Sequence, residues 1–230
     1  MITTRQMFRF SLVMGWIFPM TMLLLPSQAT ANEPPCGEEI REEVVKYLDA
    51  SQYLSDEEQL KWEAEIYEKY QACSRYSSRS AKNLNNVARA CGAQVSALGN
   101  IYYEEMGCCG YDPQRRQFTC PVTIKRGSGF GGAPLPGSRL HVLHCVAGTS
   151  GNLVPVGEDS VHIADEMHGA GPIWMFAVTA NANRNLALLQ PMDGQTRKAR
   201  SILSWQLRPT SCDYQPIWGN AINYRIRLDQ

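Results

Sequence analysis

The sequence predicts an α+β protein, in which an N-terminal helical region precedes an antiparallel β-sandwich, or a partly closed barrel, braced by disulfides. Apolar residues recur at helical spacing before residue 107 and alternate with polar residues after about residue 117. Half of the eight cysteines lie in segment 107–145, between the two patterns. The expected organisation is a signal peptide at 1–31, a helical region at 32–106 and a β-sandwich domain at 107–230.

The first residues have the pattern of a secretory signal. Arg5 and Arg9 give a positive start, residues 10–25 are largely apolar, and residues 29–31 form a small-residue cleavage site. A membrane anchor is the alternative, but this run of about 16 residues is shorter than the roughly 20 that a spanning helix needs. We therefore expect a secreted or periplasmic protein without a membrane span after cleavage.

Removal of the signal leaves a nearly neutral chain. Because the signal carries two of the 22 basic residues and none of the 22 acidic ones, the mature net charge is −2. A nucleic-acid-binding protein usually shows a basic excess, so no nucleic-acid partner is expected.

The cysteines predict a disulfide framework, since an even number of them enters an oxidising compartment. The eight are Cys36, Cys73, Cys91, Cys108, Cys109, Cys120, Cys145 and Cys212. Cys108 and Cys109 are neighbours, which seldom bond to each other, so each is expected to join a different element. We expect one of them to bond Cys91 and the other to bond a later cysteine such as Cys212.

The helical region is expected to contain three helices, at about 38–50, 55–75 and 84–102. Ser55 and Glu58 have the spacing of a capping box, which marks the start of the second helix. A bridge between Cys36 and Cys73 would hold the first two helices as an antiparallel pair. The end of the third segment, at 101–105, fits a strand equally well.

Eight short strands are expected after the helical region, and this number favours a sandwich or barrel. They lie at about 120–125, 139–146, 152–156, 160–164, 173–179, 185–189, 201–207 and 222–228. In the last of these, Ile222, Tyr224 and Ile226 face one way and Arg225 the other. Residues 173–178 are apolar on both faces, which is typical of a central strand.

A cluster of soft and imidazole side chains suggests a copper or zinc site. Its candidate ligands are His141, His162, His168 and Cys145. The neighbouring His144 shares a strand face with apolar residues and is expected in the core. No dense ligand motif is present, and a disulfide at Cys145 would remove it as a thiolate ligand.

Three aromatic residues are candidates for ligand or partner contact. Phe130 lies in the glycine-rich segment 127–132, which is not a dinucleotide loop because prolines rather than a helix follow it. Tyr214 and Trp218 lie in an irregular segment, where they would form a platform for sugars or peptides. The alternative for Trp218 is that it fills the end of the barrel.

No catalytic motif stands out, and the sequence assigns no catalytic residue and no cofactor. Pairs among the acids Glu104, Glu105, Asp165 and Glu166 would suit a glycoside hydrolase, but surface acids are common. We therefore expect a non-enzymatic binding or interaction protein of the cell envelope, with a protein or glycan partner outside the cytoplasm. A periplasmic copper- or zinc-binding protein and an envelope glycan hydrolase are the alternatives.

Overall fold

The structure is a computed structural model of the 230-residue chain. It describes residues 41–42, 44–46, 55–70, 78–131, 137–165, 174–182 and 195–228. Within this part, residues 41–42 and 44–46 are helical, and two further helices follow, α2 (Asp56–Tyr70) and α3 (Ser78–Ala90). No helix of the described residues has both the length and the apolar character needed to span a bilayer.

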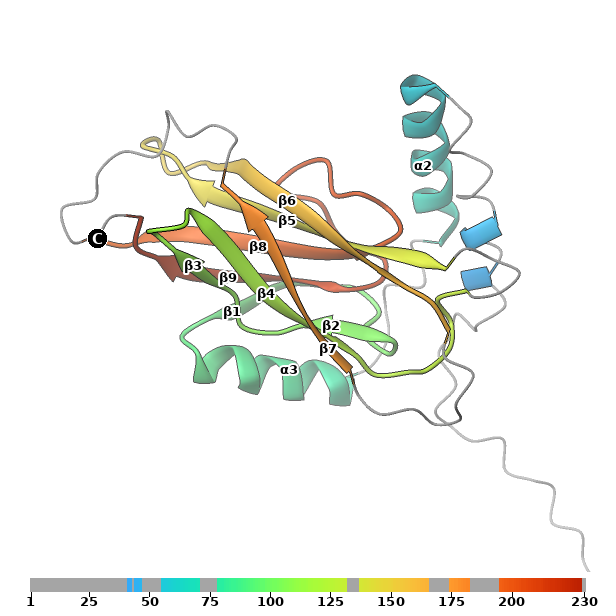
Figure 1. The fold of residues 1–230 in the computed structure, drawn as a ribbon, viewed down its shortest axis with the longest axis horizontal. Helices are drawn as coiled ribbons and strands as arrows, with labels where there is room; N and C mark the ends of the chain where they lie inside the picture. Colours follow the sequence, from blue (N-terminus) through green and yellow to red (C-terminus); the bar gives the residue numbers. More distant parts are fainter. Residues whose placement is uncertain are drawn as a thin grey trace, which may run out of the picture. The chain divides into compact units, whose positions relative to one another are not determined.

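Antiparallel strands make up most of the described fold (Figure 1). In chain order they are β1 (Gln94–Leu98), β2 (Glu104–Met106), β3 (Gly110–Asp112), β4 (Gln117–Ile124), β5 (Ser138–Ala147), β6 (Leu153–Ile163), β7 (Trp174–Asn181), β8 (Arg197–Trp205) and β9 (Asn220–Ile226). One sheet has the order β1-β9-β8-β5-β6, and the other has the order β2-β4-β3 with β7 also paired to β4. The described pairings do not join the two sheets into a closed barrel.

The two sheets share one apolar core. Phe118 and Val122 of β4 lie in the same buried cluster as Leu140 and Val142 of β5 and Ile222 of β9. These positions follow strand alternation, so each sheet buries one face and leaves the opposite face outside this cluster. The shared strand face predicted for Ile222, Tyr224 and Ile226 is confirmed, because all three belong to this core.

The expected helical region at 32–106 is not helical throughout, since it contains β1 and β2. The third expected helix stops at Ala90 because Gly92 adopts a left-handed backbone with φ of 69°. The amide of Ala93 then donates to the carbonyl of Ala88 at 2.8 Å, which ends the helix in the way glycine commonly allows. The chain continues as a strand, so the apolar residues of β1, which were expected on one face of the third helix, belong to a sheet.

The capping box is confirmed at the start of α2. The Ser55 amide donates to Glu58 Oε2 at 2.8 Å, and the Ser55 hydroxyl donates to the same oxygen at 2.6 Å. The Glu58 amide donates to Ser55 Oγ in return, at 3.4 Å. These bonds to the ionised form lower the pKa of the Glu58 carboxyl.

Several strand boundaries differ from expectation. A single strand, β6, covers the two strands expected at 152–156 and 160–164, and β3 was not expected. The expected central strand corresponds to β7, whose described partner is β4 alone, and its outward Met175 is 69% exposed. The strand expected at 185–189 lies outside the described residues.

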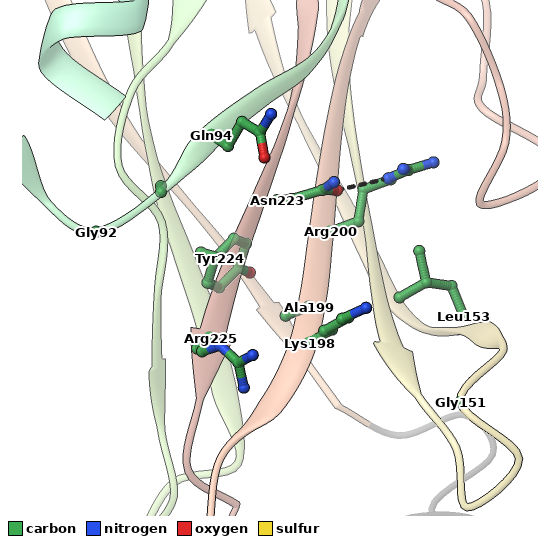
Figure 2. A pocket seen from close by; sticks show the side chains of 11 residues that line it. Gly92, Gln94, Gly151, Leu153, Lys198, Ala199, Arg200, Asn223, Tyr224 and Arg225 are labelled. Carbon is green, nitrogen blue, oxygen red and sulfur yellow. Dashed lines mark hydrogen bonds between the residues drawn. The ribbon is translucent and has the colours of Figure 1, made fainter. Parts of the chain in front are cut away.

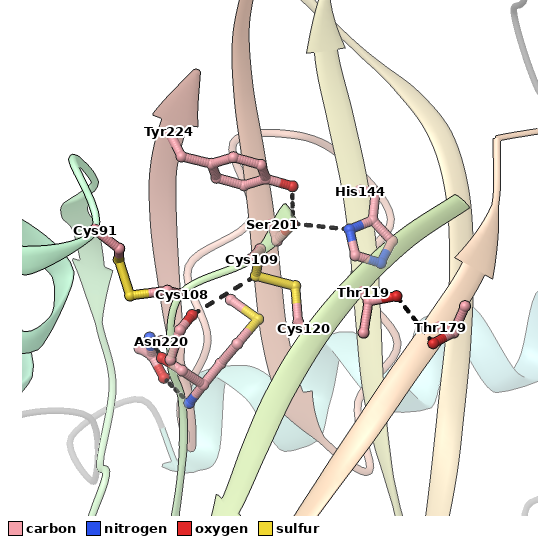
Figure 3. The surroundings of a disulfide bond; sticks show 12 residues. Cys91, Cys108, Cys109, Thr119, Cys120, His144, Thr179, Ser201, Asn220 and Tyr224 are labelled. Carbon is pink, nitrogen blue, oxygen red and sulfur yellow. Dashed lines mark hydrogen bonds between the residues drawn. A yellow bond between two sulfur atoms is a disulfide. The ribbon is translucent and has the colours of Figure 1, made fainter. Parts of the chain in front are cut away.

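Three disulfides join the described cysteines, Cys91–Cys108, Cys109–Cys120 and Cys145–Cys212, and the first two are shown in Figure 3. The predicted bridge to Cys91 is confirmed. The other cysteine of the pair bonds a later one, as expected, but this partner is Cys120 across the β3–β4 hairpin and not Cys212, which bonds Cys145. Cys36 and Cys73 lie outside the described residues.

Candidate functional site

A groove with a volume of about 460 Å³ lies on the outer face of the five-stranded sheet (Figure 2). Its walls come from the turn before β1 and from the turn between β5 and β6, and its floor comes from β8 and β9. The lining residues are Gly92, Ala93, Gln94, Gly151, Leu153, Lys198, Ala199, Arg200, Asn223, Tyr224 and Arg225. A groove of this volume is in the range of small-molecule sites.

Strand register places the polar lining residues in two rows. Asn223 of β9 pairs with Gln94 of β1 and with Arg200 of β8, so these three form one row across the sheet. Arg225 pairs with Lys198 in the second row. Residues two apart on a strand share a face, and therefore both rows point outward from the shared core.

Arg200 is held in place by its neighbours. Its Nε donates to Asn223 Oδ1 at 2.7 Å, and its Nη1 donates to the carbonyl of Cys212 at 2.9 Å and to Asp213 Oδ1 at 3.4 Å. Because the Asn223 oxygen accepts from Arg200, the N–H groups of the Asn223 amide are directed away from Arg200. The side chains of Arg200 and Asn223 are therefore positioned before any ligand arrives.

The second row carries two positive charges without a neutralising acid among the described residues. Arg225 Nη1 donates to Thr196 Oγ1 at 3.2 Å, a neutral partner. No described residue forms an ion pair with Lys198. The lining contains three cations and no carboxylate, so its charged groups are suited to bind an anion.

The predicted contact residues lie elsewhere. Trp218 is 0% exposed and Phe130 is 1% exposed, so both belong to the core. Tyr214 is half-buried and its ring contacts that of Tyr67 of α2, with centroids 5.9 Å apart. None of the three lines the groove.

Phe130 and Trp218 are instead two walls of an aromatic box around Arg41. The Arg41 Cζ lies 3.9 Å from the centroid of Trp205 and 4.1 Å from that of Tyr103, with Phe130 and Trp218 at 4.9 and 5.7 Å. Cations over aromatic faces at such distances are attracted to them. The box is filled by the chain's own side chain.

The residues predicted as metal ligands are only partly brought together. His141 and His162 lie on the same face of neighbouring strands, with His141 opposite Ser160 and His162 opposite Arg139. Cys145 is bonded to Cys212 and is not a thiolate. His168 lies outside the described residues, within which no group of three or more His, Cys, Asp or Glu side chains is placed to bind a metal.

The acids considered for a hydrolase do not form a pair. Glu104 is buried against Arg41, Glu105 pairs with Lys125, and the Asp165 carboxylate accepts from the Phe130 amide at 2.7 Å. Glu166 lies outside the described residues. The described acids therefore have structural partners, and the hydrolase alternative has no carboxylate pair among them.

The sequence did not predict the two rows of polar lining residues. The expected strand at 201–207 began too late, since β8 starts at Arg197, so Lys198 and Arg200 were not placed on a strand face. The outward orientation of Arg225 was predicted. The alternation of basic and other residues in both strands is visible in the sequence. The register between the two strands is not.

The chain matches no protein-family model, no curated protein and no solved structure. The groove and its supporting contacts are therefore the basis for assigning a function.

Proposed function

We propose that the protein is a secreted or periplasmic binding protein without catalytic activity, in which a β-sandwich presents the groove to a ligand. Three disulfides among the described residues support an oxidising compartment, where such bonds persist. The signal-peptide pattern at 1–31 supports the same location.

One observation carries the proposal: the polar lining groups of a 460 Å³ groove stand on paired strands of one sheet. Side chains on strands are positioned more accurately than those on loops, which favours recognition of a ligand of defined shape. Leu153 adds an apolar wall, so the lining combines apolar contact with directed donors, as ligand sites usually do.

A metal-binding protein is the second candidate because His141 and His162 share a strand face. Burial lowers the pKa of His141 to about 4, with the neighbouring Arg208 and Arg139 as further causes, so the ring is neutral and competent as a ligand at neutral pH. Copper or zinc in stoichiometric amount after purification without chelator, lost on substitution of both histidines, would favour this candidate over the groove.

The proposal is tested by a thermal-shift screen of the mature protein against small soluble ligands. The probes are a hexose, a hexuronate, a hexose phosphate, inorganic phosphate and a dipeptide. Gln94→Trp adds a large side chain at the exposed edge of the groove, and Met175→Trp adds the same side chain to an exposed position on the other sheet.

At least one probe is expected to raise the melting temperature of the wild type and of the Met175→Trp variant, but not that of the Gln94→Trp variant. If no probe does so, or if a probe stabilises all three proteins equally, the groove is not a ligand site.

A further inference from the structure

We propose that the groove binds a phosphate monoester, with the phosphate between Lys198 and Arg225 and the rest of the ligand along the row of Gln94, Asn223 and Arg200. This inference rests on the proposed function and names its ligand class. A phosphate monoester carries about −1.5 to −2 charges at neutral pH, which matches the two cations of the second row.

The first argument is the pairing of like charges. Lys198 and Arg225 are directly opposite each other on antiparallel strands, where side chains approach most closely and like charges destabilise the sheet. Figure 2 shows them on neighbouring strands among the lining residues. No described acid lies in the lining to offset them. A local arrangement that costs stability, with no compensating acid among the described lining residues, is typical of a functional site.

The second argument is that Arg200 and Asn223 offer N–H donors beside the cationic row. Arg200 is fixed by Asn223, by the Cys212 carbonyl and by Asp213, and this leaves the Asn223 N–H groups to donate. Hydroxyl and carbonyl oxygens accept such bonds. A phosphorylated sugar or polyol presents both a dianion and several such oxygens, whereas inorganic phosphate presents the dianion alone.

The third argument concerns the walls. Gly92 and Gly151 both have positive φ, 69° and 84°, and a Cβ on either would meet no atom within 4 Å. The two turns therefore leave open space beside the strands, and a ligand larger than phosphate has room to extend from the cationic row. Charge-assisted hydrogen bonds to phosphate are short and strong, so the cationic row is expected to dominate affinity.

The experiment compares the binding of four probes: hexose phosphate, unphosphorylated hexose, inorganic phosphate and a linear polyphosphate. Because salt screens exposed charges, sodium chloride keeps the ionic strength constant across the probes. Calorimetry gives affinities and thermal unfolding gives melting temperatures. The variants are Lys198→Gln, Lys198→Glu and the matched control Lys82→Gln, which removes an exposed lysine of α3.

Hexose phosphate is expected to bind the wild type and the control equally, and unphosphorylated hexose is expected to bind neither. Loss of one charge-assisted contact in Lys198→Gln should weaken binding by about tenfold or more. Without ligand, Lys198→Gln should melt about 1 to 3 °C above the wild type, because the like-charge pair is gone. Lys198→Glu should melt higher still, since it creates an opposite-charge pair with Arg225.

Four other outcomes would contradict the proposal or one of its arguments. Equal binding of hexose and hexose phosphate contradicts the phosphate inference and leaves a groove that binds neutral sugar. Polyphosphate binding far tighter than hexose phosphate contradicts a monoester ligand and indicates a polymer. If both Lys198 variants melt at or below the wild type, the like-charge argument is wrong. If no probe binds here, and no ligand of the thermal-shift screen stabilises the wild type more than the Gln94→Trp variant, the proposed function itself is wrong.

Discussion

At the scale of single residues, the pair of Arg41 and Glu104 is unusual because both side chains are 0% exposed. Arg41 Nη1 donates to Glu104 Oε2 at 3.0 Å across 63 residues of sequence. Burial raises the pKa of the Glu104 carboxyl and lowers that of Arg41, and the ion pair opposes both shifts. The desolvation of both groups offsets much of the attraction in such a pair, but removal of one partner leaves a buried charge alone.

Glu104→Gln is therefore expected to lower the free energy of unfolding by about 3 kcal/mol or more, since Arg41 stays buried without its counter-ion. Its neighbour Glu105 supplies the control. Glu105 pairs with Lys125 where both side chains are partly exposed, at 26% and 21%, so Glu105→Gln should cost less than about 1 kcal/mol. Urea unfolding measures both values. Equal stability of the two variants would contradict the role given to Arg41.

At the scale of elements, side-chain hydrogen bonds link strands that are not paired through their backbones. The Met106 amide of β2 donates to Asn220 Oδ1 at 2.8 Å, and Asn220 Nδ2 donates to the Met106 carbonyl at 3.0 Å, which ties the two sheets together. On β6, Gly157 lies so close to β7 that a Cβ would be 2.5 Å from the Asn181 carbonyl oxygen. The two sheets therefore approach each other at two places, between β2 and β9 and between β6 and β7.

A buried polar chain crosses three strands of the larger sheet (Figure 3). His144 Nδ1 of β5 is 2.8 Å from Ser201 Oγ of β8, which is 2.8 Å from the Tyr224 hydroxyl of β9. The His144 ring also stacks on Phe118 of β4, with centroids 4.9 Å apart. Burial lowers the pKa of His144 to about 3 and raises that of Tyr224, so the chain is neutral in the folded protein.

This chain predicts acid sensitivity. Below the usual histidine pKa of 6.5 the unfolded chain binds a proton that folded His144 does not bind until about pH 3, so stability falls as the pH falls through this window. His144→Phe should reduce the slope of unfolding free energy between about pH 4 and 6 by about 1.4 kcal/mol per pH unit. His141→Gln should flatten the slope only above about pH 4, where folded His141 titrates. Urea unfolding at several pH values measures this, and an unchanged slope in His144→Phe contradicts it.

At the scale of the whole molecule, the disulfides differ in what they connect. Cys91–Cys108 and Cys109–Cys120 span 17 and 11 residues, whereas Cys145–Cys212 spans 67. The long bridge joins β5 to the segment that precedes β9, and a second small core forms around it with Leu143, Ile202 and Ala221. The Cys212 carbonyl also accepts from Arg200, so the bridge supports the groove.

Replacement of both Cys145 and Cys212 by alanine is therefore expected to lower the free energy of unfolding by about 2–4 kcal/mol, because a long loop is no longer closed in the unfolded chain. The same change at Cys109 and Cys120 should cost about 1.5 kcal/mol less, since its loop is shorter. Urea unfolding of the two double variants gives the comparison. A larger loss at the short bridge would contradict the loop-length argument.

The sequence predicted features that depend on neighbours along the chain. The Ser55–Glu58 capping box, the inward face of β9 and the β-rich character after residue 117 all follow from spacing over a few residues. The third helix was extended too far because Gly92 was read within a helical pattern, although its left-handed backbone ends the helix.

Tertiary structure alone decided that Cys145 bonds Cys212, that Arg41 is buried against Glu104 and that the strand register places Lys198 opposite Arg225. Each of these depends on residues far apart in sequence. A shift of one residue in strand register turns every side chain to the other face, and local pattern does not fix the register between β8 and β9. The sequence by itself determined which residues tend to form strands, and long-range packing determined which of their side chains meet.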